Sequence, residues 1–137
     1  MSELSPEREI LSDCRTVAVV GVSPDAERPS HGVFCYLRDH GYRVIPVNPR
    51  FPRILGETCY PDLAAIPEKV DVVDIFRRAE DVPPVVDQAI AIGARAVWMQ
   101  RGIVNEAAAV RAREAGLQVV MDKCIKIEHL RMREMPE

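Results

Sequence analysis

Five short apolar runs recur along the chain and constrain its fold more than any other feature of the sequence. They cover residues 16–22, 42–47, 71–76, 95–99 and 117–121. Strands that are apolar on both faces belong to a parallel sheet that helices cover on both sides. The runs therefore predict five parallel strands at the centre of an α/β domain.

The segments between these runs carry helix signals and end at glycine. Asp81 precedes a helical segment that ends at Gly93. Asn105 caps a second segment, which ends at Gly116, and residues 31–40 form a third. This alternation predicts a three-layer α/β fold, a doubly wound parallel five-stranded sheet with helices on both faces and right-handed crossovers.

Further helices are expected at both ends, one over about residues 5–13 and one over about residues 123–133. In the second, Ile127, Leu130 and Met132 fall on one side, which predicts docking on the sheet edge. The proline-rich stretch 49–70 predicts a loop, a short extended piece around Thr58 to Tyr60 and one helical turn.

Composition limits the class of protein. A length of 137 residues suits one domain, which we take as residues 1–137. A net charge of -3 argues against binding nucleic acid or anionic membranes. The N-terminal stretch is charged where a secretory signal would be apolar, so we expect a cytoplasmic protein. Apolar edge elements leave room for a homodimer.

The four cysteines have neither the paired spacing of a zinc site nor that of a disulfide framework. We expect no metal site. Cys35 and Cys59 are expected to be reduced, buried thiols.

The first loop at the carboxyl edge of the predicted sheet, residues 21–30, suits a phosphate. No glycines follow Gly21 at the spacing of the dinucleotide fingerprint, so a plain dinucleotide turn is disfavoured. The loop instead offers Ser23, Arg28, Ser30 and a helix N-terminus. The alternative is that Gly21 only lets the chain leave the strand, with Arg28 solvated.

The second loop discriminates between nucleotides. NAD-binding domains place an acid here to bind the ribose, but this chain has Asn48, Arg50 and Arg53. A phosphorylated ribose is therefore predicted, as in coenzyme A (CoA), with its 3′-phosphate, or NADP, with its 2′-phosphate. A simple turn with exposed arginines is the alternative.

The third and fourth loops add further candidates. Phe76 can cover an adenine or a pantetheine arm, and Arg77 can reach a diphosphate. Gln100 offers an amide, and Gly102 permits close backbone approach. The alternative is that Phe76 belongs to the core and that the arginines pair with nearby carboxylates.

The stretches "VGVSPDAERPSHGV", "GYRVIPVNPR", "DVVDIFRR", "AVWMQRGIVNEAA" and "GLQVVMDKCIKIEH" together resemble the small CoA-binding protein family. That family is related to the CoA-binding domain in the alpha subunit of succinyl-CoA synthetase. The resemblance runs over about residues 10–130. It implies a Rossmann-like fold that holds CoA or an acyl-CoA across the strand ends.

The resemblance also implies roles for residues of each loop. The first loop would meet the phosphates, the second the nucleotide, the third would flank the arm and the fourth would close the far side. The residues carried over are Gly21, Val22, Ser23, Asn48, Arg50, Phe76, Arg77, Met99, Gln100 and Gly102. Arg28 and Ser30 come from the loop chemistry alone.

We expect a binding module rather than an enzyme, with no catalytic residues. The phosphohistidine of the synthetase sits on a second domain, so His31, His40 and His129 inherit no such role. His40 is expected to cap a helix C-terminus. Asp71 and Asp74 are expected to be structural.

Two alternatives remain open. Cys124 follows Lys123 at a helix N-terminus, and both features favour a thiolate that could form a mixed disulfide with CoA. Cys124 could instead be a buried cysteine that holds the last helix. Asp122 and Lys123 could pair with each other. An NADP-binding, oxidoreductase-like domain would share the arginines but lacks the glycine pattern.

Overall fold

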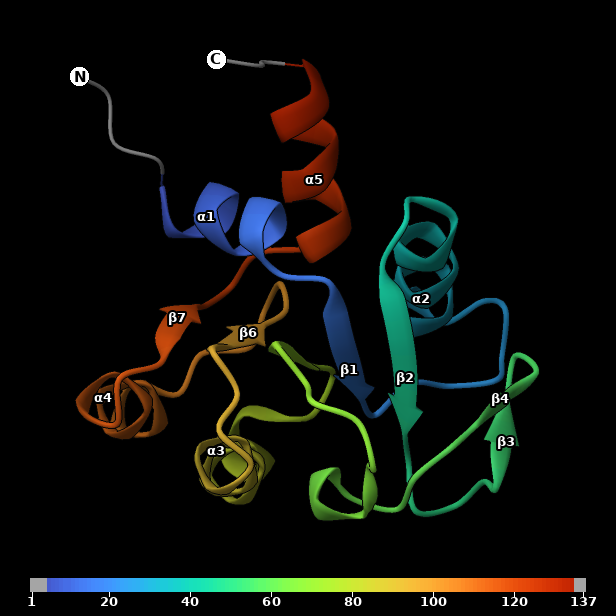
Figure 1. The fold of residues 1–137 in the computed structure, drawn as a ribbon, viewed down its shortest axis with the longest axis horizontal. Helices are drawn as coiled ribbons and strands as arrows, with labels where there is room; N and C mark the ends of the chain where they lie inside the picture. Colours follow the sequence, from blue (N-terminus) through green and yellow to red (C-terminus); the bar gives the residue numbers. More distant parts are fainter. Residues whose placement is uncertain (1–4, 135–137) are drawn as a thin grey trace.

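The computed structural model describes residues 5–134 and has a five-stranded sheet at its centre (Figure 1). All neighbouring strands of this sheet are parallel, in the order β2-β1-β5-β6-β7. The strands are β1 (Thr16–Val20), β2 (Arg43–Val47), β5 (Val72–Ile75), β6 (Ala96–Met99) and β7 (Gln118–Val120). The predicted doubly wound parallel sheet is confirmed.

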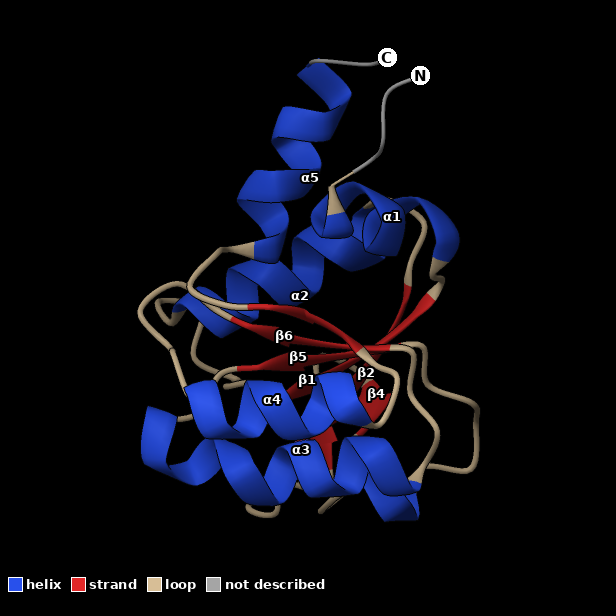
Figure 2. Ribbon diagram, turned by 90° about the vertical axis from the view of Figure 1, so that its left-hand side faces the viewer, coloured by secondary structure: helices blue, strands red, loops and turns tan. Residues whose placement is uncertain are grey.

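Helices cover both faces of the sheet (Figure 2). One face carries α3 (Val82–Ala91) and α4 (Glu106–Glu114). The other face carries α1 (Pro6–Asp13), α2 (Pro29–Asp39) and α5 (Ile125–Glu134). Each face has its own buried apolar cluster, so the fold has two core layers. No helix within residues 5–134 is long and apolar enough to cross a membrane.

The strand order reverses between β1 and β5, which is where ligands bind in open α/β sheets. Gly21 leaves β1 at this point with φ +88°, and its N–H donates to Val47 O at 2.9 Å. A Cβ at Gly21 would lie 2.3 Å from Phe76 O. Only glycine lets the first and third loops approach this closely.

The proline-rich stretch after β2 contains more regular structure than predicted. Tyr60 bridges to Val47, and a single 3-10 turn covers Leu63–Ala65. Both match the extended piece and the helical turn that the sequence suggested. The antiparallel hairpin of β3 (Arg53–Ile54) and β4 (Glu57–Thr58) was not predicted.

The packing of α5 differs from the expectation. Its main contacts are with α1 and α2. Ile125, at its beginning, belongs to the same core cluster as residues of the sheet, and Figure 1 shows the rest of the helix extending away from the sheet. Its buried residues are Ile125 and His129. Ile127 and Leu130 are only partly buried, whereas Met132 packs against the core. The buried His129 has its Nδ1 2.7 Å from the Tyr36 hydroxyl of α2.

Candidate functional site

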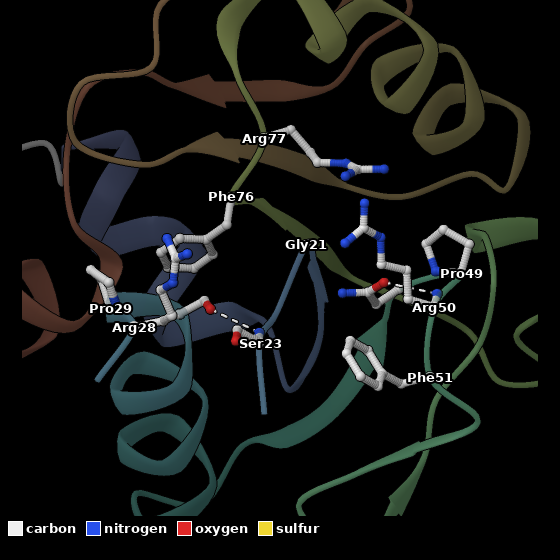
Figure 3. A pocket seen from close by; sticks show the side chains of 11 residues that line it. Gly21, Ser23, Arg28, Pro29, Pro49, Arg50, Phe51, Phe76 and Arg77 are labelled. Atoms are coloured by element: carbon white, nitrogen blue, oxygen red, sulfur yellow. Dashed lines mark hydrogen bonds between the residues drawn. The ribbon is translucent and has the colours of Figure 1, made fainter. Parts of the chain in front are cut away.

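An open pocket of about 550 Å³ lies at the carboxyl edge of the sheet, beside the point where the strand order reverses (Figure 3). Residues from the loops after β1, β2 and β5 line it. They are Gly21, Ser23, Arg28, Pro29, Ser30, Asn48, Pro49, Arg50, Phe51, Phe76 and Arg77. Three loops that are far apart in the sequence therefore form one cavity.

The pocket is cationic. Arg28, Arg50 and Arg77 each come from a different loop, and Arg50 and Arg77 extend toward the same space in Figure 3. Within residues 5–134, no carboxylate pairs with these three arginines and none lines the pocket. Arg78, in contrast, pairs with Asp81 at 3.2 Å. Three unpaired guanidinium groups around a hollow favour a polyanionic ligand.

The first loop presents a helix N-terminus to the pocket. Helix α2 begins at Pro29, and Arg28, in the N-cap position, makes no side-chain cap hydrogen bond. The Ser30 hydroxyl is buried and accepts a hydrogen bond from Ser23 N at 2.9 Å. Ser30 thus shapes the loop, while the positive end of the helix faces the cavity and suits a phosphate.

The side chain of Asn48 joins the first loop to the second. Its Nδ2 donates to Val22 O at 2.9 Å, and its Oδ1 accepts from Arg50 N at 3.0 Å. Both functions of the amide are therefore used within the protein. Asn48 lines the pocket, and its main contribution is to fix the backbone of Arg50.

We expect Asn48→Ala to lower the free energy of unfolding by about 1–3 kcal/mol, because it removes both hydrogen bonds at a partly buried site. Asn48→Asp should cost less, since it keeps the acceptor for Arg50 N. Urea denaturation of the three proteins measures the difference. Equal stability of Asn48→Ala and the parent would show that the two bonds contribute nothing.

Two aromatic rings line the cavity. Phe76 is half-buried and packs against the core on the α2 side, so it is both a core residue and a pocket wall. Phe51, Pro49 and Pro29 also line the pocket and were not predicted. The sequence signal that could have pointed to Phe51 as a pocket residue was its position between Pro49 and Pro52, in the loop after β2.

Four of the predicted residues lie outside the pocket. Val22 and Met99 are fully buried, so their side chains support the strand ends from within the core. Gln100 is also buried, and its Oε1 accepts from Ile125 N at 3.2 Å. Gly102 lies in an exposed turn after β6. In this structure the fourth loop does not reach the cavity.

The pairing of Lys123 with Asp122 is not found. Lys123 Nζ binds Glu7 Oε2 at 2.5 Å, and Asp122 Oδ1 accepts from Gly102 N at 2.6 Å. The Lys123 charge is therefore directed to α1. Cys124 is a partly exposed free thiol that packs against the α2-side core and does not line the pocket. The mixed disulfide stays a prediction, which mass spectrometry after diamide treatment with CoA tests.

The other histidines and cysteines have structural positions. His40 is the C-cap residue of α2, as predicted, and its Nδ1 lies 2.7 Å from Tyr36 O. Cys59 is buried as expected, and burial raises the pKa of its thiol. Cys35 was expected to be buried but is partly exposed, with its Sγ 3.9 Å from His31 Nδ1. No group of three or more His, Cys, Asp or Glu within residues 5–134 could hold a metal ion.

The two aspartates of β5 differ. Asp71, just before the strand, accepts from Arg15 N at 2.9 Å and Thr16 N at 3.0 Å, which is the expected structural role. Asp74 is fully buried, and neither of its carboxyl oxygens has a hydrogen-bond partner within residues 5–134. Burial raises the pKa of Asp74 well above its usual range.

Residues 15–130 match the family model described as a CoA-binding domain. The chain belongs to the CoA-binding domain family. The resemblance found in the sequence is thus confirmed. The family relationship supports a CoA-related binding function.

The chain is similar in sequence or in structure to several known proteins. The uncharacterized protein YneT of Bacillus subtilis is 40% identical over 122 residues, 89% of this chain and 90% of that protein. ADP-forming acetate–CoA ligase II of Archaeoglobus fulgidus is 33% identical over 104 residues, which are 74% of this chain but 16% of the ligase. This chain is homologous to the CoA-binding domain of such ligases. A solved structure of a hypothetical protein from Pyrococcus horikoshii OT3 has a TM-score of 0.91 and 41% identity, covering 97% of this chain and 99% of that one.

Proposed function

We propose that the pocket binds CoA or an acyl-CoA and that the protein does not transform it. The observation that carries the proposal is a set of three arginines, Arg28, Arg50 and Arg77, that have no carboxylate partner within residues 5–134 and surround a pocket where α2 begins. A ligand with a diphosphate and a separate ribose phosphate can satisfy all three. Membership of the CoA-binding domain family supports this choice of ligand.

The geometry supports an orientation for the ligand. The diphosphate would lie over Gly21 and the N-terminus of α2, where backbone N–H groups and the helix dipole favour negative charge. The ribose 3′-phosphate would lie at Arg50, on the second loop. The pantetheine arm would pass Phe76, and Arg77, beside it on the third loop, would reach the diphosphate.

The lining of the pocket supports binding over catalysis. No His, Cys, Asp or Glu of the described residues lines it, and its charged groups are all arginines. Arginine remains protonated in proteins and is a poor general base. The pocket can therefore hold and orient an anion but lacks a group to move a proton at neutral pH.

NADP is the alternative ligand, because it also carries a phosphorylated ribose. Isothermal titration of the protein with CoA and with NADP separates the two. We expect CoA to bind more tightly, since the first loop lacks the glycines that let a dinucleotide pyrophosphate approach the backbone. Binding of NADP without binding of CoA would overturn the proposal.

Replacing Arg50 by alanine should weaken CoA more than dephospho-CoA. The loss for CoA should be about 1.5–3 kcal/mol, as expected for a charge-assisted hydrogen bond to phosphate. Dephospho-CoA lacks the 3′-phosphate and should lose little. Titration calorimetry of both ligands with both proteins measures the effect.

Arg113→Ala is the matched control for the loss of one positive charge, because Arg113 lies on α4 and does not line the pocket. It should leave the affinity for both ligands nearly unchanged. If Arg50→Ala weakened CoA and dephospho-CoA equally, Arg50 would not lie at the 3′-phosphate.

A further inference from the structure

Asp74 is an uncompensated polar group in the core. It lies on β5 between Val19 of β1 and Trp98 of β6, which are its partners in the parallel register. Val19 and Trp98 belong to the apolar cluster beneath α2 and α5, so the Asp74 side chain faces the same layer. The indole N–H of Trp98 is already used, since it donates to Lys123 O at 2.8 Å. Buried polar groups in proteins nearly always have a partner, and this one has none within residues 5–134.

The carboxyl group lies close to the pocket. Phe76 follows Asp74 by two residues, and Phe76 N donates to Val20 O at 2.8 Å, which continues the ladder between β5 and β1. Alternate residues of a strand face the same side of a sheet, so the two side chains are neighbours. Phe76 lines the pocket on one side and packs against the core on the other. Phe76 is therefore the pocket-lining residue that comes next after Asp74 on this face of the sheet.

We propose that Asp74 is the inner end of the ligand-binding pocket and that, when the Phe76 ring turns aside, its carboxyl donates a hydrogen bond to a carbonyl oxygen in the arm of the ligand. The inference rests on the proposed function, because it concerns the part of CoA that follows the diphosphate. It assigns a partner to the only buried side-chain oxygens in residues 5–134 that lack one.

The protonation state of Asp74 determines whether it can bind a hydrogen-bond acceptor or a donor. Burial raises the pKa of this carboxyl well above its usual range, so it stays protonated where an exposed aspartate is ionised. A protonated carboxyl is a donor and suits a neutral acceptor. The arm of CoA contains amide carbonyls, and an acyl-CoA adds a thioester carbonyl. A carboxylate at this depth would meet only apolar surroundings and is disfavoured.

The test compares two ligands with three proteins. The ligands are CoA and 3′-phospho-ADP, which has the same phosphates but no arm. The proteins are the parent, Asp74→Leu, which removes the donor, and Asp74→Asn, which keeps a donor of the same shape. We expect Asp74→Leu to weaken CoA about tenfold, the usual effect of losing one hydrogen bond with a buried partner, and to leave 3′-phospho-ADP unchanged. Asp74→Asn should retain most of the affinity for CoA.

A spectroscopic measurement on the parent protein does not depend on the folding of a variant. Exposed carboxyls are ionised at neutral pH, so the carbonyl stretch of a protonated carboxyl in infrared difference spectra of the parent reports on Asp74. Adding CoA should shift this band, because the carboxyl gains an acceptor, whereas 3′-phospho-ADP should leave it in place.

The outcomes separate this inference from the proposed function. If both ligands bound but Asp74→Leu bound CoA like the parent, or if CoA left the infrared band unmoved, Asp74 would not contact the arm and the inference would be wrong. If the parent bound neither ligand, the proposed function would fail and the inference with it.

Discussion

Replacing Gly21 by alanine is expected to abolish CoA binding and to lower the free energy of unfolding by about 2–4 kcal/mol, the combined cost of an unfavourable positive φ and of an overpacked contact. The new Cβ would lie 2.3 Å from Phe76 O and 3.3 Å from Arg77 Cδ, and φ at this position is +88°. Relief requires that the first and third loops move apart. The part of the pocket that lies between the two loops would then be lost.

Gly32→Ala is the matched control, because Gly32 lies in α2 and a Cβ there meets nothing within 4 Å. Alanine is favoured over glycine within a helix, so this change should be neutral or stabilising by about 0.5–1 kcal/mol. Urea denaturation and titration with CoA measure both variants. A Gly21→Ala protein that is as stable as the parent and binds CoA normally would contradict the close approach of the two loops.

The second large effect concerns Asp74 and pH. Its folded-state pKa is raised above the value of about 3.9 of an unfolded chain, so the folded state binds the proton more tightly. The stability that this group contributes is complete below the unfolded pKa and is lost as pH rises toward the folded pKa. The loss should be about 1.4 kcal/mol for each pH unit in that window. Asp74→Asn does not titrate and should lose none of it.

The measurement is the free energy of unfolding of both proteins from pH 4 upward, by urea denaturation. The advantage of Asp74→Asn over the parent should grow with pH. Asp71→Asn is the control of opposite sign: burial raises the pKa of Asp71, but the bonds from Arg15 N and Thr16 N outweigh it, and the net pKa is lowered. The contribution of Asp71 is therefore present above the unfolded pKa and lost as pH falls. A parallel pH dependence of the parent and Asp74→Asn would mean that Asp74 is not held protonated.

The sheet and its main helices followed from local patterns. The five apolar runs form the five parallel strands. A strand that is buried on both faces carries apolar side chains on both, so it appears in the sequence as a continuous apolar run. Asn105 caps α4 as predicted, with its Oδ1 accepting from Ala108 N at 3.0 Å. These features depend on residues that are neighbours in the sequence. Their physical causes can therefore be inferred from the sequence alone.

Two features of the fold were missed, one because its strands are very short and one because it involves a distant partner. The hairpin of β3 and β4 is two residues long on each side, too short for a periodicity to appear. The buried face of α5 includes His129, which contacts Tyr36 of another helix. A partly polar anchor of this kind has no signature in the hydropathy of α5 itself.

Some features of the candidate site were likewise predicted from the sequence, and others were missed. The loops after β1, β2 and β5 meet as expected, because the carboxyl ends of parallel strands share one edge. Met99 came from the family resemblance, and Gln100 came from it and from its amide at a strand end. Both are buried in the core, and neither lines the pocket. The sequence also could not show that the buried Asp74 carboxyl lacks a hydrogen-bond partner, because that depends on which groups surround it in the fold.

A crystal structure of the protein grown with CoA is the most direct test of the central claim. We expect the 3′-phosphate within hydrogen-bond distance of Arg50, and the diphosphate over Gly21 and the beginning of α2. CoA bound at another surface, with this pocket filled by side chains of the protein, would contradict the claim.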